Sequence, residues 1–162
     1  MATAKKKPTD VKKLISILET GIELEKKGLG AYLKFAHKTK SMTGKNMFIR
    51  LAFDELEHMK ILEKIRGARL AGKAFRKPPL PMKEINAMLP KLREKQFLKE
   101  ADDGLADIDA LKTALEMEKK SANYFRKIAQ QEKDPKIVDL AGDLAKWEEF
   151  HYDLLQGGDR LH

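Results

Sequence analysis

The chain has 162 residues, with 33 Lys and Arg against 25 Asp and Glu, a net charge of +8 and no Cys. This length permits one domain with a sizeable core. The absence of Cys excludes disulfides, thiolate nucleophiles, thiolate zinc sites and cysteine-bound iron–sulfur clusters, and it fits a reducing cytoplasm. No apolar run approaches the roughly 18 residues of a membrane span, and no apolar segment follows the basic start. We therefore expect a cytoplasmic protein with no membrane partner.

Four segments place apolar residues at three- and four-residue steps, which is the period of an amphipathic helix. They run from about Asp10 to Lys38, from Thr43 to Ala71, from Asp107 to about 131, and from Pro135 to about Gly157. Either of residues 9 and 10 can cap the first segment, and Asp134 followed by proline is a strong start for the fourth. Strand signals are absent. The pattern predicts an all-α protein.

The lengths of the connections predict how the helices are joined. Short links near residues 39–44 and 131–134 require antiparallel neighbours, whereas residues 72–106 are long enough to cross a bundle and contain four prolines. We predict one ferritin-like four-helix domain over residues 1–162, made of a helical hairpin (10–71), a basic crossover (72–106) and a second hairpin (107–157). Within the crossover we expect Met82–Leu98 to form one or two short helices.

The positive charge is concentrated in one segment. Lys60–Lys99 has twelve Lys and Arg against three acidic residues, a net charge of +9, so the rest of the chain sums to −1. Such a segment can bind nucleic acid. It offers only Phe75 and Phe97 for base stacking, so we favour a solvated charged face and expect no nucleic-acid partner.

Each apolar stripe is interrupted by charged or titratable residues at positions that should face the core. These residues are Glu25, Glu55, His58, Glu118, Glu148 and His151. Four carboxylates inside a bundle without an inward Lys or Arg cost several kcal/mol for each unpaired charge, unless protons or metal ions offset them. One Glu from each of two helices and Glu-x-x-His from each of the others is the ligand set of ferritin-like dinuclear proteins.

We therefore predict a site for two metal ions. Carboxylate oxygen together with imidazole favours iron, with manganese possible, over copper or structural zinc. The alternative is a set of polar interruptions in an inert bundle. His37 and His162 have no comparable partners, and we expect them at the surface or the terminus.

The six candidate ligands repeat along the chain. Glu25, Glu55 and His58 each recur 93 residues later, and residues 23–27 resemble residues 116–120. The chain is thus a duplicated helical hairpin. Since each pair of glutamates is centred on its own short connection, both sets of ligands should lie at one level of the bundle.

The motif Glu23–Gly28 followed by Tyr32, then Asp54–His58, then Trp147–His151 resembles the rubrerythrin branch of the ferritin-like superfamily. The resemblance implies two iron ions, with Glu25 and Glu118 as terminal ligands, Glu55 and Glu148 as bridging ligands, and one of His58 and His151 on each ion. It also matches Tyr32 to a tyrosine beside the family's ligands. Both a hydrogen-bonding role and a plain core role are open for this residue, whose repeat partner is Phe125.

Two departures from the family pattern affect the expected function. Rubrerythrins carry a rubredoxin domain with four cysteines, so we expect an external electron donor here, such as a separate rubredoxin-like protein. They also carry an extra Glu at the position of Ser121, whose repeat partner is Gly28. These small residues leave space for O₂ or peroxide beside the metals, or they serve close helix packing, as Gly21 and Gly30 also would.

The resemblance implies a non-haem di-iron oxidoreductase. It would reduce hydrogen peroxide or O₂ as a peroxidase or ferroxidase, in oxidative-stress defence or iron handling, and we expect a homodimer or higher homo-oligomer. One alternative is a ferritin-type iron-storage subunit. A further alternative is a di-iron protein associated with nucleic acid through the basic segment.

Overall fold

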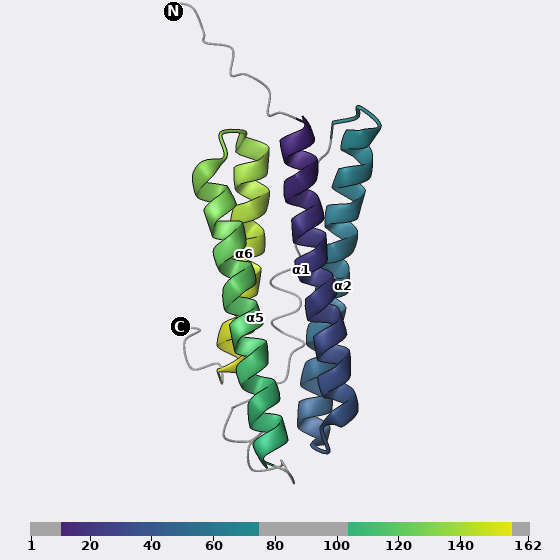
Figure 1. Ribbon diagram of the computed structural model, residues 1–162, viewed down its shortest axis with the longest axis vertical. Helices are drawn as coiled ribbons and strands as arrows, with labels where there is room; N and C mark the ends of the chain where they lie inside the picture. Colours follow the sequence, from purple (N-terminus) through teal and green to yellow (C-terminus); the bar gives the residue numbers. More distant parts are fainter. Residues whose placement is uncertain (1–10, 75–103, 157–162) are drawn as a thin grey trace, which may run out of the picture.

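Four long helices form a bundle in the computed structural model, which describes residues 11–74 and 104–156 (Figure 1). They are α1 (Val11–Lys38), α2 (Met42–Leu70), α5 (Gly104–Gln131) and α6 (Pro135–Leu155). The described residues contain no strand. The predicted all-α fold is confirmed.

The helices pair as the connection lengths predict. Helix α1 packs against α2, α5 packs against α6, and the two pairs meet in part along α1 and α5. Helix α2 ends at one end of the bundle and α5 begins at the other (Figure 1). The predicted crossover therefore connects opposite ends, whereas residues 75–103, including Met82–Leu98 and most of the basic segment, lie outside the described residues.

Capping residues explain two of the helix starts. Oδ1 of Asp134 accepts a hydrogen bond from the backbone N–H of Lys136 at 3.0 Å, and proline occupies the first position of α6. This confirms the predicted start. Oγ of Ser41 accepts from the N–H of Gly44 at 3.0 Å, so α2 begins at Met42, one residue before the predicted Thr43.

The other predicted bounds differ slightly from the observed ones. Helix α2 ends at Leu70, one residue early, and α5 begins at Gly104, three residues before the predicted Asp107. Helix α6 ends at Leu155, short of the predicted Gly157. The caps proposed at residues 9 and 10 lie outside the described residues. Local periodicity sets the centre of a helix more firmly than its ends.

The core consists of two apolar clusters, one toward each end of the bundle. One cluster includes Leu18, Leu62 and Leu144, and the other includes Phe48 and Leu51. Full burial of each such side chain is worth about 1.5–3 kcal/mol. The six candidate ligands lie between the clusters along the chain, so apolar packing closes the polar layer from both ends.

Within residues 11–74 and 104–156, no helix combines the length and the hydropathy needed to cross a bilayer.

Candidate metal centre

All six predicted ligands are buried, and they converge on one polar layer. Each is no more than 2 % exposed. They fall into two sets of four residues, and within each set the possible ligand atoms lie within 4.8 Å of one another. One set is Glu25, Glu55, His58 and Glu148, and the other is Glu55, Glu118, Glu148 and His151. Glu55 and Glu148 belong to both sets, which is the arrangement that bridging carboxylates require.

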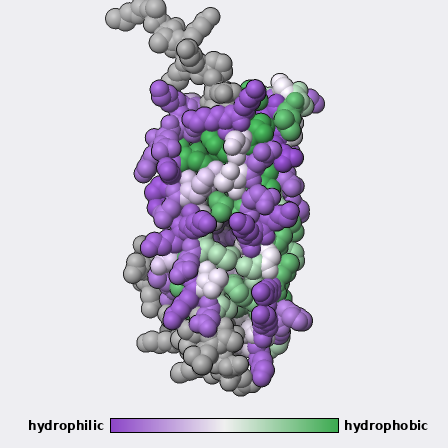
Figure 2. Space-filling view, in the orientation of Figure 1, coloured by the Kyte–Doolittle hydropathy of each residue, from purple (hydrophilic) through white to green (hydrophobic). Residues whose placement is uncertain are grey.

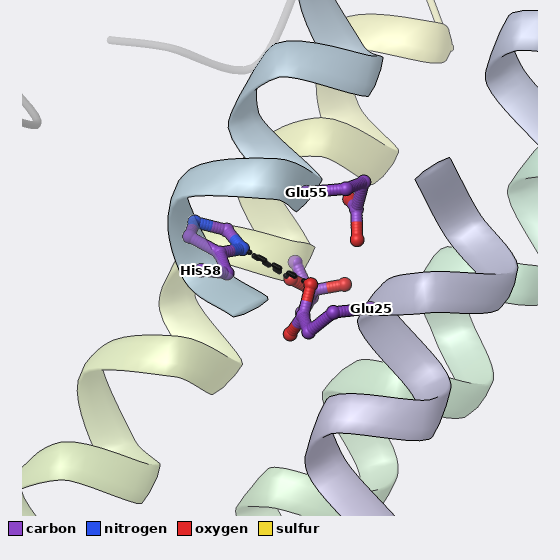
Figure 3. Close-up of side chains that lie close together, drawn as sticks. Glu25, Glu55 and His58 are labelled. Atoms are coloured by element: carbon purple, nitrogen blue, oxygen red, sulfur yellow. Dashed lines mark hydrogen bonds and ion pairs between the residues drawn. The ribbon is translucent and has the colours of Figure 1, made fainter. Parts of the chain in front are cut away.

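The first set joins three helices around His58. Residues three apart on a helix share a face, so α2 presents Glu55 and His58 together to the interior. Nδ1 of His58 lies 3.3 Å from Oε2 of Glu25 on α1 (Figure 3). The same nitrogen lies 3.3 Å from Oε1 of Glu148 on α6. The imidazole therefore directs one nitrogen at a carboxylate of each hairpin.

The second set repeats this arrangement around His151. Nδ1 of His151 lies 3.2 Å from Oε1 of Glu55 on α2 and 3.4 Å from Oε1 of Glu118 on α5. The rings of His58 and His151 are stacked, with centroids 5.8 Å apart. The duplication seen in the sequence thus produces two similar half-sites that face each other.

The unsatisfied atoms of the layer fit two bound cations. One buried atom in each of the six side chains has no hydrogen-bond partner among the described residues. They are Oε1 of Glu25, Oε1 of Glu55, Nε2 of His58, Oε2 of Glu118, Oε1 of Glu148 and Nδ1 of His151. An unpaired buried polar atom costs about 1–3 kcal/mol. No buried residue of the described part is Lys or Arg, so the four carboxylates match the charge of two divalent ions.

Without metal, burial favours the protonated form of Glu25, Glu55 and Glu148. Burial raises the pKa of Glu25 to about 7, and the nearby charge of Glu118 adds to this rise. Burial and the charge of Glu25 also raise the pKa of Glu55 and of Glu148 well above the ordinary value. Burial lowers the pKa of His151, but the charge of Glu118 and the hydrogen bond with Asp54 outweigh it and raise the pKa well above its usual value.

Tyr32 contacts the layer directly. Its hydroxyl donates a hydrogen bond to Oε1 of Glu118 on the other hairpin. Burial and the charge of Glu118 raise the pKa of Tyr32 well above 10, so the phenol keeps its proton and remains a donor. Of the two roles left open by the sequence, the hydrogen-bonding one is observed. The repeat partner Phe125 lies in an apolar cluster and donates no such bond.

Asp54 is a buried carboxylate that the sequence interpretation missed. It is 3 % exposed, and its Oδ2 lies 3.1 Å from Nε2 of His151. Nε of Arg50 lies 3.7 Å from its other oxygen. The described residues therefore bury five acidic side chains, not the four that we expected. The sequence did contain a signal for this residue. Asp54 directly precedes Glu55, and the 93-residue repeat breaks at this position, where the counterpart is Trp147.

The indole of Trp147 reaches the same histidine nitrogen. Its Nε1 lies 3.0 Å from Nε2 of His151 and donates to it only when that nitrogen carries no proton. An imidazole that binds metal through Nδ1 carries its proton on Nε2 and donates it outward. With Nδ1 of His151 as the ligand, Asp54 is therefore the partner of the far nitrogen.

A pocket leads from the surface to Glu55 and Glu148, the two carboxylates shared by both sets. It has a volume of about 90 Å³, enough for several water molecules. Its lining comes mainly from repeat-equivalent positions of α1 and α5, namely Leu24 and Met117, Lys27 and Lys120, Gly28 and Ser121, together with Glu55, Glu118 and Glu148. Figure 2 shows this face, where hydrophilic side chains flank a small hollow near the middle.

The small residues of α1 serve different purposes. A Cβ on Gly28 would lie 2.8 Å from Oε2 of Glu55, so glycine makes room for that carboxylate. A Cβ on Gly21 would lie 3.2 Å from Leu62, which agrees with close helix packing. Close packing does not account for Gly30, because a Cβ added at this position would meet no neighbouring side chain or helix within 4 Å. Ser121 lines the pocket and is buried.

The two remaining histidines are not part of the layer as far as the structure describes them. His37 is exposed near the end of α1, as expected. His162 lies outside the described residues.

A four-helix bundle that buries two Glu-x-x-His motifs and two further glutamates in one layer defines the ferritin-like class of dinuclear carboxylate proteins. Comparison with known proteins agrees, since the family model described as Rubrerythrin matches residues 16–157. The chain belongs to the rubrerythrin family, which consists of di-iron proteins of the ferritin-like superfamily. No curated protein and no solved structure gives a significant match.

Proposed function

We propose that this protein is a di-iron oxidoreductase that reduces hydrogen peroxide or O₂ with electrons from a separate donor protein. The observation that carries the proposal is the pair of carboxylates, Glu55 and Glu148, shared by both ligand sets and reached by the pocket. A shared pair can hold two ions at the short separation that two-metal chemistry uses. Manganese remains the alternative metal, because its ligand preferences overlap with those of iron.

Two bound ferrous ions would supply one electron each, which with two protons reduces hydrogen peroxide to two water molecules. The protein contributes placement and exclusion of water. The pocket admits a molecule the size of peroxide at the bridging carboxylates, and the two apolar clusters exclude bulk water from the ends of the layer. Tyr32 donates to Glu118 and so restrains a terminal ligand.

The proposed electron donor is a separate protein. These 162 residues contain no Cys, so they cannot supply the thiolates of a rubredoxin-type iron site. The donor would deliver electrons one at a time at the surface of the bundle, and a rubredoxin-like protein fits that role.

Metal analysis followed by a single turnover tests this function. Protein from iron-supplemented cells should contain about two metal ions per chain, and peroxide added to the anaerobically reduced form should oxidise it with one peroxide per site. Glu55→Gln and Glu148→Gln should each lose most of the metal, because each removes a carboxylate shared by both half-sites. Glu57→Gln is the matched control, since Glu57 lies on the same helix but is exposed.

Fewer than about one metal ion per chain, with both bridging variants no different from the original protein, would overturn the proposal. The ferritin-type alternative has a separate readout. A storage protein would elute as a very large particle that accumulates many iron ions per chain, whereas an oxidoreductase would elute as a small oligomer.

A further inference from the structure

The two half-sites differ at one pair of equivalent positions. The six ligands repeat with an offset of 93 residues, but the residue before each bridging Glu does not. It is Asp54 in the first hairpin and Trp147 in the second. Both side chains are buried, at 3 % and 2 % exposure. The duplication therefore produces the same ligands but different surroundings for the two histidines.

His151 has a carboxylate on its far nitrogen. Oδ2 of Asp54 lies 3.1 Å from Nε2, while Nδ1 faces Glu55 and Glu118 at 3.2 and 3.4 Å. Arg50, at 3.7 Å from the other oxygen, supports the negative charge of Asp54. A carboxylate in this place keeps the proton on Nε2, orients the ring and makes Nδ1 a stronger ligand.

His58 lacks an equivalent partner. Its Nδ1 faces Glu25 and Glu148, and its Nε2 is buried without a hydrogen-bond partner among the described residues. Figure 3 shows this second nitrogen on the side of the ring away from Glu25. Trp147 meets the ring of His58 edge to face, with centroids 4.8 Å apart, but its Nε1 lies beside His151 and not beside Nε2 of His58. Nothing described here orients His58 through its far nitrogen.

We propose that Asp54 makes the two metal positions unequal, so that the position of His151 and Glu118 fills first and holds its ion more tightly than the position of His58 and Glu25. Asp54 is a positioning residue in this proposal, because it acts on the metal only through His151. The inference rests on the proposed metal site. A carboxylate behind a histidine ligand typically changes metal affinity by 10–100-fold, which sets the expected difference.

Anaerobic calorimetric titration of the full metal-free chain with Co²⁺ and with Fe²⁺ tests the proposal. The original protein should show two binding steps of different affinity. Asp54→Ala should weaken the tighter step by about 10–100-fold and leave the weaker step nearly unchanged. Asp54→Asn should have a smaller effect, because the amide oxygen still accepts from Nε2–H. Glu57→Gln removes an exposed charge from the same helix and should leave both steps unchanged.

The Co²⁺-loaded protein gives a second readout that does not depend on activity. Its proton NMR spectrum should contain one shifted, exchangeable imidazole N–H signal protected by Asp54, and Asp54→Asn should move that signal while the signals of the other histidine persist. A general loss of folding would instead alter both sets of signals and the helical circular dichroism.

The outcomes separate the two proposals. Two equal binding steps in the original protein, or an equal effect of Asp54→Ala on both steps, would show that Asp54 does not make the two metal positions unequal and would leave the metal site intact. Absence of any binding by the original protein would overturn the metal site and the inequality together.

Discussion

The hydroxyl of Tyr32, on α1, donates a hydrogen bond to Oε1 of Glu118, on α5. This bond joins the two hairpins beside the candidate metal ligands, and the repeat partner of Tyr32, Phe125, has no hydroxyl to form its counterpart. The bond therefore restrains Glu118, and Phe125 cannot form the equivalent bond to Glu25. The contact between Asp54 and His151 belongs to the same half-site as Glu118. Both of these contacts to candidate ligands therefore lie in the half-site of His151 and Glu118.

Replacement of Tyr32 by Phe tests this restraint. Tyr32→Phe removes the donor but keeps the buried ring, so we expect helicity to be retained and the affinity for the tighter metal ion to fall by about tenfold or more. Metal titration measures the change. Tyr124→Phe is the control, because the Tyr124 hydroxyl bonds the backbone carbonyl of Ile17, away from the ligands. Equal effects of the two substitutions would show that the Tyr32 hydroxyl has no special role.

Gly28 and Gly30 form a matched pair on α1. Alanine in place of a mid-helix glycine normally stabilises by up to about 1 kcal/mol. Gly30→Ala should do so without affecting metal content, because nothing lies within 4 Å of the added Cβ. Gly28→Ala should reduce metal content, because its Cβ would lie 2.8 Å from Oε2 of Glu55 and displace that carboxylate. Thermal unfolding and metal analysis of both variants check this, and full metal content in Gly28→Ala would contradict it.

The stability of the metal-free protein should fall as the pH rises. Folding raises the pKa of Glu25 from 4.5 to about 7, so between these values the folded protein holds a proton that the unfolded chain has released. Each pKa unit corresponds to roughly 1.4 kcal/mol, and the raised pKa values of Glu55, Glu148 and His151 act in the same direction. The melting temperature should therefore be higher at about pH 5 than at pH 8.

Thermal unfolding in the presence of a chelator measures this dependence. Glu25→Gln removes this titratable carboxyl group, so the melting temperature of the variant should decline less as the pH rises. A melting temperature of the metal-free protein that rises between pH 5 and pH 8 would contradict the predicted direction.

Metal binding should stabilise the fold and reverse this pH dependence. Bound cations displace the protons and satisfy the buried atoms, and a free ion at 100 times its dissociation constant stabilises by about 2.7 kcal/mol per site. We expect Fe²⁺ or Mn²⁺ to raise the melting temperature more at pH 8 than at pH 6. Mg²⁺ should have a smaller effect, because it prefers an octahedral set of oxygen ligands and retains its waters. No shift with any of these ions would contradict a metal-binding layer.

Much of this molecule could be predicted from local sequence patterns. The three- and four-residue apolar steps predicted four helices, and the 93-residue offset predicted that Glu25, Glu55 and His58 would meet their counterparts at one level. Such features depend on helical period and connection length, which the order of residues determines directly. Only the ends of the helices moved, by a few residues, because capping depends on individual side-chain contacts.

The contacts behind the ligands depended on how the helices pack. Asp54 lies about 100° around the helix from Glu55, a position that could face either solvent or a neighbouring helix. The approach of α6 decided this by placing His151 within 3.1 Å of its carboxylate. In the same way, the spacing of Tyr32 left its role open until α5 brought Glu118 to its hydroxyl. The sequence alone determined which residues could bind metal, whereas the rotation and depth of helix packing decided which ligands are supported, because those contacts join residues far apart in the chain.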